Sequence, residues 1–273
     1  MADRRVTPAR ADLAAAHLKG KVQAERYVEG RMWDVHVGRA SLRTEPSGRA
    51  AQDSELLYGE RVAVYDVSDD GWAWIQAESD RYVGYVRNEA LGEVEAATLR
   101  VCALMAPVFS AADLKSAITD FLPMNAMLMV RSRQGDYVEF EHGRFVHQRH
   151  LGPAEKDYVS VAERFLGAPY VWGGKTAAGL DCSGLIQTAL QATGKAAPRD
   201  TDMMEKALGE PVPLSDIRRG DLVFWKGHMG VMLDETRLLH ANAFHMLVAI
   251  ENLAEAVARI EKVAGPVTAV KRL

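Results

Sequence analysis

Three side chains of this 273-residue sequence have types and settings suited to nucleophilic catalysis: Cys182, His228 and His240. Cys182 opens a run of apolar residues at helical spacing, which predicts a thiol in the first turn of a helix. Unpaired backbone N–H groups and the helix dipole favour an anion there, so the thiol pKa is expected to fall below its usual value of about 8.5. For a lone cysteine, an inert buried side chain is the plain alternative.

The two histidines flank consecutive strand-like runs. His228 precedes the first run and His240 ends the second, with Asp234-Glu235 as the expected turn between them. If the strands pair antiparallel about that turn, the imidazoles are cross-strand neighbours, within about 5.5 Å at their Cβ atoms. A helix that carries Cys182 to this end of the sheet completes the arrangement. Cys182 then attacks, His228 takes the thiol proton, and His240 orients His228.

A zinc site is the alternative use of the same residues, because one cysteine and two histidines are suitable ligands. The sequence contains no C-x-x-C or H-x-x-x-H spacing, and we expect neither a metal nor another cofactor. His142, His147 and His150 form a second group of histidines, which we interpret as a solvated strand end.

The region after Pro153 predicts an α+β fold. Helical periodicity over 158–166, 183–193 and 200–208 precedes strand-like runs at 220–225, 228–233 and 238–241. A late helix over 251–263 and a returning strand at 267–270 complete the pattern. Helices followed by a meander of strands are typical of helices packed on an antiparallel sheet.

The region before Pro153 has the pattern of small β barrels. Short strand-like runs at 62–65, 72–75 and 82–86 alternate with turn clusters, and a weaker copy of this plan follows at 126–146. Both copies end on Leu-Gly. Residues 1–32, with an alanine-rich run, are expected to form a partly helical arm. The predicted division of the chain is therefore an arm (1–32), two barrels (33–93 and 94–153) and the α+β domain (154–273).

Composition and charge exclude several classes of protein. The formal net charge is −4 and no dense Lys/Arg run occurs, which argues against nucleic-acid binding. Residues 1–21 lack a continuous apolar stretch, and no segment approaches the roughly 20 apolar residues of a membrane span. We therefore expect a cytoplasmic protein that binds neither nucleic acid nor membrane, in which Cys102 and Cys182 stay reduced. The sequence leaves the oligomeric state open.

Five blocks in residues 155–273 resemble the NlpC/P60 family of cysteine peptidases. The blocks are Pro169–Gly174, Asp181–Leu185, Pro198–Thr201, Gly220–Phe224 and Gly227–Val231. The resemblance implies a papain-like α+β fold that cleaves cell-wall peptides, with Cys182 as nucleophile, His228 as base and His240 as third polar residue. It also implies that backbone N–H groups at the helix start bind the oxyanion, where one donor is worth about 3 kcal/mol. Ala196-Ala197 depart from the family pattern, in which a bulkier apolar residue is common before the proline.

The first barrel, from Ser41 to Val86, is similar to bacterial SH3 (SH3b) domains, and the second barrel is similar more weakly. This combination resembles the γ-D-glutamyl-L-diamino-acid endopeptidases of the dipeptidyl-peptidase VI type. Those enzymes cut between D-Glu and meso-diaminopimelate or Lys in murein peptides that begin with a free L-Ala, and their first SH3b domain closes the site. The resemblance implies that Asp200 binds the free amine, because a desolvated ammonium needs a charged acceptor. The other residues that it implies in substrate binding are Tyr170, Asp181, Ser183, Arg199, Thr201, Glu60 and Tyr82.

Simpler roles are open for some of these residues, because Arg199 and Asp200 could pair or cap a helix and Tyr82 could belong to a barrel core. Two other functions are also open for the whole chain. One is a peptide-binding SH3b protein with an inactive C-terminal domain, against which the intact Cys182, His228 and His240 count. The other is a thiol amidase or acyltransferase on the same fold. A free-amine requirement restricts the predicted peptidase to trimmed peptides, which suits cytoplasmic recycling of the cell wall.

Overall fold

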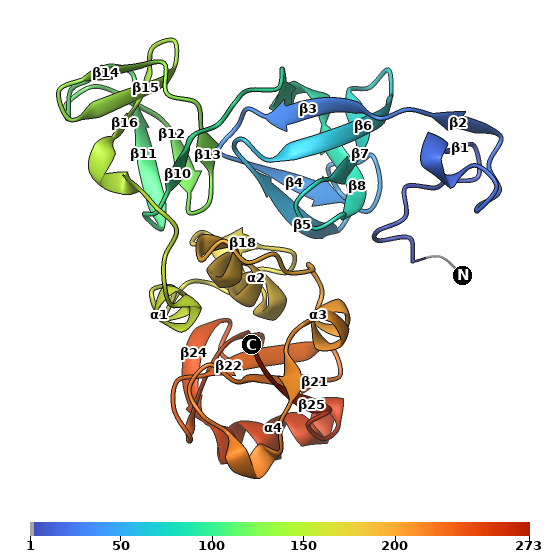
Figure 1. Cartoon of the computed structure of the whole chain (residues 1–273), viewed down its shortest axis with the longest axis vertical. Coiled ribbons are helices and arrows are strands. Elements are labelled where there is room, and N and C mark those ends of the chain that lie inside the picture. Colours follow the sequence, from blue (N-terminus) through green and yellow to red (C-terminus); the bar gives the residue numbers. More distant parts are fainter. Residues whose placement is uncertain (1–2) are drawn as a thin grey trace. The chain divides into compact units, whose positions relative to one another are not determined.

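The computed structural model describes residues 3–273, which divide into two compact units that meet at Pro153 and Ala154. The N-terminal unit begins with two short strands in place of the predicted partly helical arm (Figure 1). β1 (Leu13–Ala15) pairs in parallel with β2 (Arg26–Val28), and a single 3₁₀ turn over Ala16–Leu18 lies between them. All three residues of β1 are buried, and this burial outweighs the helix propensity of the two alanines.

A seven-stranded antiparallel sheet forms the first half of the N-terminal unit. Its order is β5-β4-β8-β7-β6-β3-β9, and its strands are β3 (Arg31–Val35), β4 (Arg39–Arg43), β5 (Gln52–Leu57), β6 (Arg61–Val67), β7 (Trp72–Ala77), β8 (Val83–Arg87) and β9 (Leu91–Gly92). A 3₁₀ turn over Asn88–Ala90 links the last two. Every residue of strand β7 is buried, so both faces of the sheet are covered at this strand. The N-terminal segment covers the outer face, where Gln76 donates to the Val6 carbonyl at 3.0 Å and Arg10 lies over the Trp74 ring.

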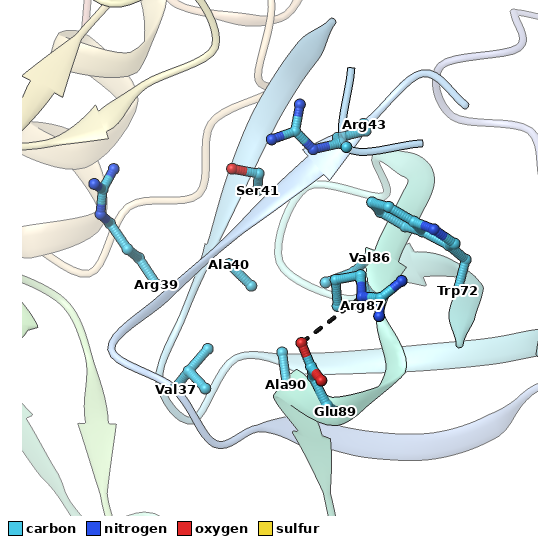
Figure 2. Close-up of a pocket in the computed structure, with 11 residues that line it drawn as sticks. Val37, Arg39, Ala40, Ser41, Arg43, Trp72, Val86, Arg87, Glu89 and Ala90 are labelled. Atoms are coloured by element: carbon cyan, nitrogen blue, oxygen red, sulfur yellow. Dashed lines mark ion pairs between the residues drawn. The ribbon is translucent and has the colours of Figure 1, made fainter. Parts of the chain in front are cut away.

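A pocket of about 490 Å³ opens on this half (Figure 2). Residues of β4 line one side and residues near β8 line the other; they include Val37, Arg39, Ser41, Arg43, Trp72, Val86, Arg87 and Glu89. Each guanidinium on the rim already has a partner within the barrel. Arg39 binds Glu55, Arg43 donates to the Ala50 carbonyl, and Arg87 donates to the Asp70 carbonyl. We assign this pocket no ligand.

Two further sheets build the second half of the N-terminal unit. The five-stranded sheet has the order β12-β11-β16-β15-β14, and the three-stranded sheet has the order β13-β10-β17. The strands are β10 (Leu99–Val101), β11 (Met105–Phe109), β12 (Ile118–Pro123), β13 (Met127–Leu128), β14 (Ser132–Gln134), β15 (Tyr137–Glu141), β16 (Arg144–His147) and β17 (Leu151–Gly152). A 3₁₀ turn over Gln148–His150 precedes the last strand. The predicted likeness of this half to SH3b domains stays a prediction.

Each half of the N-terminal unit has its own hydrophobic core, and one residue of the first half lies in the core of the second. Tyr58, from the turn after β5, is 2% exposed and packs among the buried residues of the second half. Its ring meets Phe140 edge-on at 5.3 Å, and its hydroxyl donates to Glu141 at 2.7 Å. The Met127 amide donates to the Tyr58 carbonyl at 2.9 Å, so backbone as well as side chain joins the halves.

The C-terminal unit has the predicted α+β composition. Its six strands are all antiparallel, in the order β20-β25-β21-β22-β23-β24. They are β20 (Glu210–Pro211), β21 (Leu222–Trp225), β22 (His228–Met232), β23 (Arg237–Asn242), β24 (Leu247–Asn252) and β25 (Ala269–Arg272). The helices are α1 (Tyr158–Glu163), α2 (Cys182–Ala192), α3 (Thr201–Ala207) and α4 (Leu253–Ala264), with a 3₁₀ turn at Leu214–Asp216 and a small hairpin of β18 (Lys175–Thr176) and β19 (Gly179–Leu180).

Helices α2 and α4 lie on opposite sides of this sheet (Figure 1). Helix α2 contacts β22 and β23, and almost all of its residues are buried, which makes it the central helix of the unit. Helix α4 packs Ala256 and Ile260 against a cluster on the sheet that includes Trp225 and Leu238. Because α2 begins at Cys182, its packing fixes where the thiol meets the sheet.

The sequence pattern placed the last helix too early. A helix was expected over 251–263, but β24 continues to Asn252 and α4 begins at Leu253. The Asn252 side chain caps the helix by accepting from the Ala254 amide at 2.9 Å. Glu251 is therefore a strand residue in register with Leu238 of β23, which places its carboxylate beside the predicted histidine pair.

Candidate active site

Cys182 is the first residue of α2, as its position in the sequence predicted. Asp181 is the N-cap, and its carboxylate accepts from the Gly184 amide at 2.7 Å. The pKa of the thiol nevertheless moves in the direction opposite to the expected one. Burial raises the pKa of Cys182 to about 11, helped by the negative charge of Asp181 and opposed by hydrogen bonds from Thr201 and from the Met229 and Ser183 amides. The side chain is 7% exposed, so desolvation outweighs the helix start.

The two histidines meet across β22 and β23. His228 Nε2 and His240 Nδ1 are 2.9 Å apart, which confirms that the imidazoles are neighbours. The register, however, differs from the expected one, because the Asp234 side chain organises a longer turn and Leu233 pairs with Arg237. His228 and His240 therefore meet diagonally.

Glycine at position 230 makes this diagonal contact possible. A Cβ added to Gly230 would lie 2.9 Å from the Cβ of His240 and 2.8 Å from Leu238 Cδ1. The missing side chain leaves the space over β22 that the His228 ring, two residues earlier on the same face, uses to reach His240.

Both imidazoles are neutral at physiological pH. Burial, with a smaller contribution from His240, lowers the pKa of His228 to about 3. Burial also lowers the pKa of His240 to about 4, against the opposing effect of Glu251. His240 is fully buried, and its Nε2 lies 2.6 Å from Glu251 Oε2. The thiol and both imidazoles are therefore neutral in the free protein.

The thiol lies beside the start of β22, where the backbone of Met229 hydrogen-bonds to it directly after His228. The hydrogen bond from the Met229 amide holds the sulfur of Cys182 against the residue that directly follows His228. This arrangement suits general-base catalysis, in which the imidazole takes the thiol proton as the sulfur attacks.

The pKa values predict how the thiol reacts with alkylating agents. In a Cys102→Ala background, the rate of alkylation of Cys182 by iodoacetamide should be low at pH 7 and should rise continuously up to about pH 10, because the thiolate fraction grows as the pH approaches a pKa of about 11. Mass-spectrometric quantification of the modified Cys182 peptide measures the rate. A rate that is already at its plateau at pH 6 would instead reveal a preformed thiolate–imidazolium pair.

Asp181, Ser183 and Arg199 were implied in substrate binding, and the structure places all three in one buried cluster. Arg199 is completely buried and binds Asp181 through two N–H···O contacts of 2.9 and 2.7 Å. It also donates to Ser183 Oγ at 2.9 Å and to the Gly174 carbonyl at 3.3 Å. These contacts direct the guanidinium into the protein, so the cluster fixes the cap of α2 and the glycine turn before it.

Tyr170 and Thr201 lie near the thiol, and Asp200 directly precedes Thr201. Partial burial and the nearby Cys182 and Asp181 raise the pKa of Tyr170 to about 12. Thr201 Oγ1 lies 3.7 Å from the Cys182 sulfur. Asp200 is the half-buried N-cap residue of α3, directly before Thr201, and its side chain makes no capping hydrogen bond. The neighbouring Arg199 binds Asp181.

Glu60 and Tyr82 belong to the N-terminal unit. Glu60 is half-buried before β6, and its carbonyl accepts from the Val35 amide. Tyr82 is 3% exposed and belongs to the core of the first sheet, which is the structural role left open for it. Their part in substrate binding stays a prediction.

Sequence reasoning missed two residues that extend the site. Glu251 binds His240, and Arg259 of α4 binds Glu251 with Nη2–Oε2 and Nε–Oε1 distances of 2.5 and 3.3 Å. The signal for a strand at 247–252 was present in Leu247-Val248-Ala249-Ile250, but the following helical pattern was extended back over it.

Across residues 3–273, no group of three or more His, Cys, Asp or Glu side chains has a metal-binding arrangement. No helix in the same range has the length and hydropathy needed to span a membrane.

Comparisons with known proteins agree with the resemblance in sequence. Residues 167–263 match the NlpC/P60 family, and residues 42–91 match the bacterial dipeptidyl-peptidase Sh3 domain. The chain carries an NlpC/P60 domain. The matched region of this NlpC/P60 domain contains the thiol, both histidines and Glu251.

Two relatives illustrate the similarity. A γ-D-glutamyl-L-lysine dipeptidyl-peptidase of Bacillus subtilis is 34% identical over 42% of this chain and 43% of its own length. Dipeptidyl-peptidase 6 of Lysinibacillus sphaericus is 25% identical over 79% of this chain and 89% of its own length. The chain thus spans less than half of the first relative and most of the second.

Solved structures share the fold. An NlpC/P60 family protein from Bacillus cereus superposes with a TM-score of 0.73 at 17% identity, covering 89% of this chain and 99% of that one. An NlpC/P60 endopeptidase from Photobacterium damselae subsp. piscicida gives a TM-score of 0.63 at 14% identity, covering 88% of this chain and 71% of that one. At these identities the likeness establishes fold alone.

Proposed function

We propose that this protein is a cysteine endopeptidase that hydrolyses the bond between D-Glu and a diamino acid, meso-diaminopimelate or Lys, in murein peptides with a free N-terminal L-Ala. The observation that carries the proposal is the buried thiol of Cys182, which accepts a hydrogen bond from the Met229 amide directly after His228, together with the hydrogen bond that joins His228 to His240. The specificity in the name of the Bacillus subtilis relative, a γ-D-glutamyl-L-lysine dipeptidyl-peptidase, supports the choice of bond. We further propose that the protein acts on trimmed peptides during cytoplasmic recycling of the cell wall.

In the proposed reaction, the Cys182 sulfur attacks the carbonyl carbon of the γ-D-Glu residue while His228 takes the thiol proton. Backbone N–H groups at the start of α2 stabilise the oxyanion. The C–N bond then breaks, and His228 returns the proton to the departing amine of the diamino acid. Water, deprotonated by His228, hydrolyses the thioester and releases the peptide ending in D-Glu together with the free thiol.

We propose that Asp200 binds the free amine of L-Ala. Asp200 directly precedes Thr201, whose hydroxyl lies 3.7 Å from the sulfur. This position in the chain supports a role for its carboxylate close to the reacting centre. Asp181, the other carboxylate beside the thiol, is already bound by Arg199. A half-buried carboxylate is the acceptor that a desolvated ammonium requires. In this proposal Tyr170 and Thr201 line the pocket, whereas Asp181, Ser183 and Arg199 hold its shape.

A matched pair of substrates tests this specificity. The wild-type protein should cleave L-Ala-γ-D-Glu-meso-diaminopimelate with its amine free and should leave the N-acylated peptide intact, with release of diaminopimelate measured by mass spectrometry. Replacing Asp200 with Asn should lower kcat/KM for the free peptide by about 30- to 1,000-fold, the effect of removing one partner of a desolvated charge pair. The melting temperature should change little.

Asp202→Asn, on the first turn of the same helix, is the matched control for Asp200→Asn, and its kcat/KM should stay close to that of the wild type. Equal cleavage of the free and acylated peptides would remove the role given to Asp200 and keep the thiol peptidase. Failure to cleave either peptide would favour a peptide-binding protein or a different thiol reaction.

A further inference from the structure

We infer that Glu251 is a positioning residue of this active site, which sets the tautomers of both histidines from the far end of a hydrogen-bond chain. The expected effect of Glu251 on kcat rests on the proposed function, whereas its effect on the histidine tautomers does not. The chain runs from His228 through His240 to Glu251, with links of 2.9 and 2.6 Å. Arg259 ends it by binding the Glu251 carboxylate.

The charge state of Glu251 is the first step. Burial alone would raise the pKa of this carboxyl, but the hydrogen bond from Arg259 and the proximity of His240 outweigh it, so the pKa lies below its usual range. Glu251 is therefore an anion at neutral pH and only accepts hydrogen bonds. Arg259 itself is held in place, because the Phe244 ring lies 4.4 Å from its guanidinium carbon.

The tautomers follow from this charge. Because the carboxylate cannot donate, the neutral His240 must carry its proton on Nε2, which leaves Nδ1 as an acceptor. His228 must then donate its Nε2 proton to that nitrogen. The unprotonated nitrogen of His228 is therefore Nδ1, at the other side of the ring. This nitrogen is the base that accepts the thiol proton in the proposed reaction.

The same chain stabilises the charged intermediate. Once His228 takes the thiol proton it becomes an imidazolium, which donates to His240 Nδ1. The negative charge of Glu251 lies one imidazole further on, behind the fully buried ring of His240, where charges interact more strongly than in water. His245, whose Nδ1 is 3.9 Å from the same carboxylate oxygen, is the other titratable group that faces Glu251.

The experiment is Glu251→Gln in the full-length protein, which keeps the shape of the side chain and removes its charge. We expect kcat for the free murein tripeptide to fall by about 10- to 100-fold with KM within twofold of the wild type, an effect typical of residues that orient a reacting histidine through a second group. Glu261→Gln, an exposed position of α4, is the matched control and should retain wild-type kcat and KM. A wild-type kcat in Glu251→Gln would overturn the inference.

A structural readout keeps the test independent of activity. In ¹⁵N-histidine-labelled protein at pH 7, long-range ¹H–¹⁵N spectra should show His228 and His240 as Nε2–H tautomers. Glu251→Leu, which removes the acceptor, should shift His240 towards its Nδ1–H form, and Glu251→Asp should preserve the wild-type signals. Unchanged tautomers in Glu251→Leu would overturn the inference. If the wild type cleaves no murein peptide, the proposed function fails while these spectra still decide the role of Glu251.

Discussion

Replacing Cys182 with alanine should reduce hydrolysis of the murein tripeptide by at least about 1,000-fold, because the remaining groups cannot form the covalent intermediate. The expected result depends on the setting of this thiol at the start of α2. Initial rates of diaminopimelate release, followed over a range of enzyme concentrations, measure the loss. The fold should survive, since the change removes one sulfur atom from a site that still has its cap and its buried ion pair.

Cys102 provides the control. It is a free thiol in the N-terminal unit whose sulfur donates to the His150 carbonyl at 3.3 Å. Cys102→Ala should keep wild-type kcat/KM. Equal losses in the two variants would indicate that activity reports general damage to the protein, and full activity in Cys182→Ala would eliminate the thiol mechanism.

The largest effect on stability is expected at Arg199. Replacing it with methionine leaves the Asp181 carboxylate buried without its cation, which should destabilise the region around α2 by about 3–5 kcal/mol. Arg199 is fully buried and Asp181 is 6% exposed, so water cannot easily replace the lost partner. Native-state hydrogen exchange of the α2 amides measures the free energy of opening at this helix.

Two further variants show whether the effect comes from the unpaired charge. Arg164→Met breaks a solvent-exposed pair with Glu155 and should cost no more than about 1 kcal/mol. Adding Asp181→Asn to Arg199→Met should restore part of the lost stability. If Arg199→Met and Arg164→Met had equal effects, the buried pair would not support the cap of α2.

The chemistry-bearing residues were predictable because their signals are local. A cysteine at the start of a helical pattern and a histidine at each end of a strand pair appear directly in the spacing of the sequence. The contact between the two histidines is confirmed, although the register of their strands differs from the expected one. The alternation of strands does not reveal how many residues a turn contains, and here the side chain of Asp234 adds to it.

The parts that were not predictable depend on tertiary context. The thiol pKa was expected to fall because the helix start is a local feature, whereas the burial that raises it comes from α2 packing into the domain. Similarly, the alanines of β1 have a strong helix propensity but become a buried strand. Glu251 was assigned to a helix because a short strand directly followed by a helix has no clear boundary in the sequence.

The shared position of Tyr58 has a consequence for how the N-terminal half of the gene can vary. The turn that carries this residue belongs to the first copy of the repeat, but its ring completes the interior of the second copy. The two copies are therefore joined across the boundary predicted at residues 93–94. Loss or exchange of the first copy would leave a gap in the core of the second copy. Loss or exchange of the second copy would expose Tyr58 on the first. Recombination at the boundary of the repeat is therefore expected to cost stability, and transfer of both copies together is expected to keep these contacts.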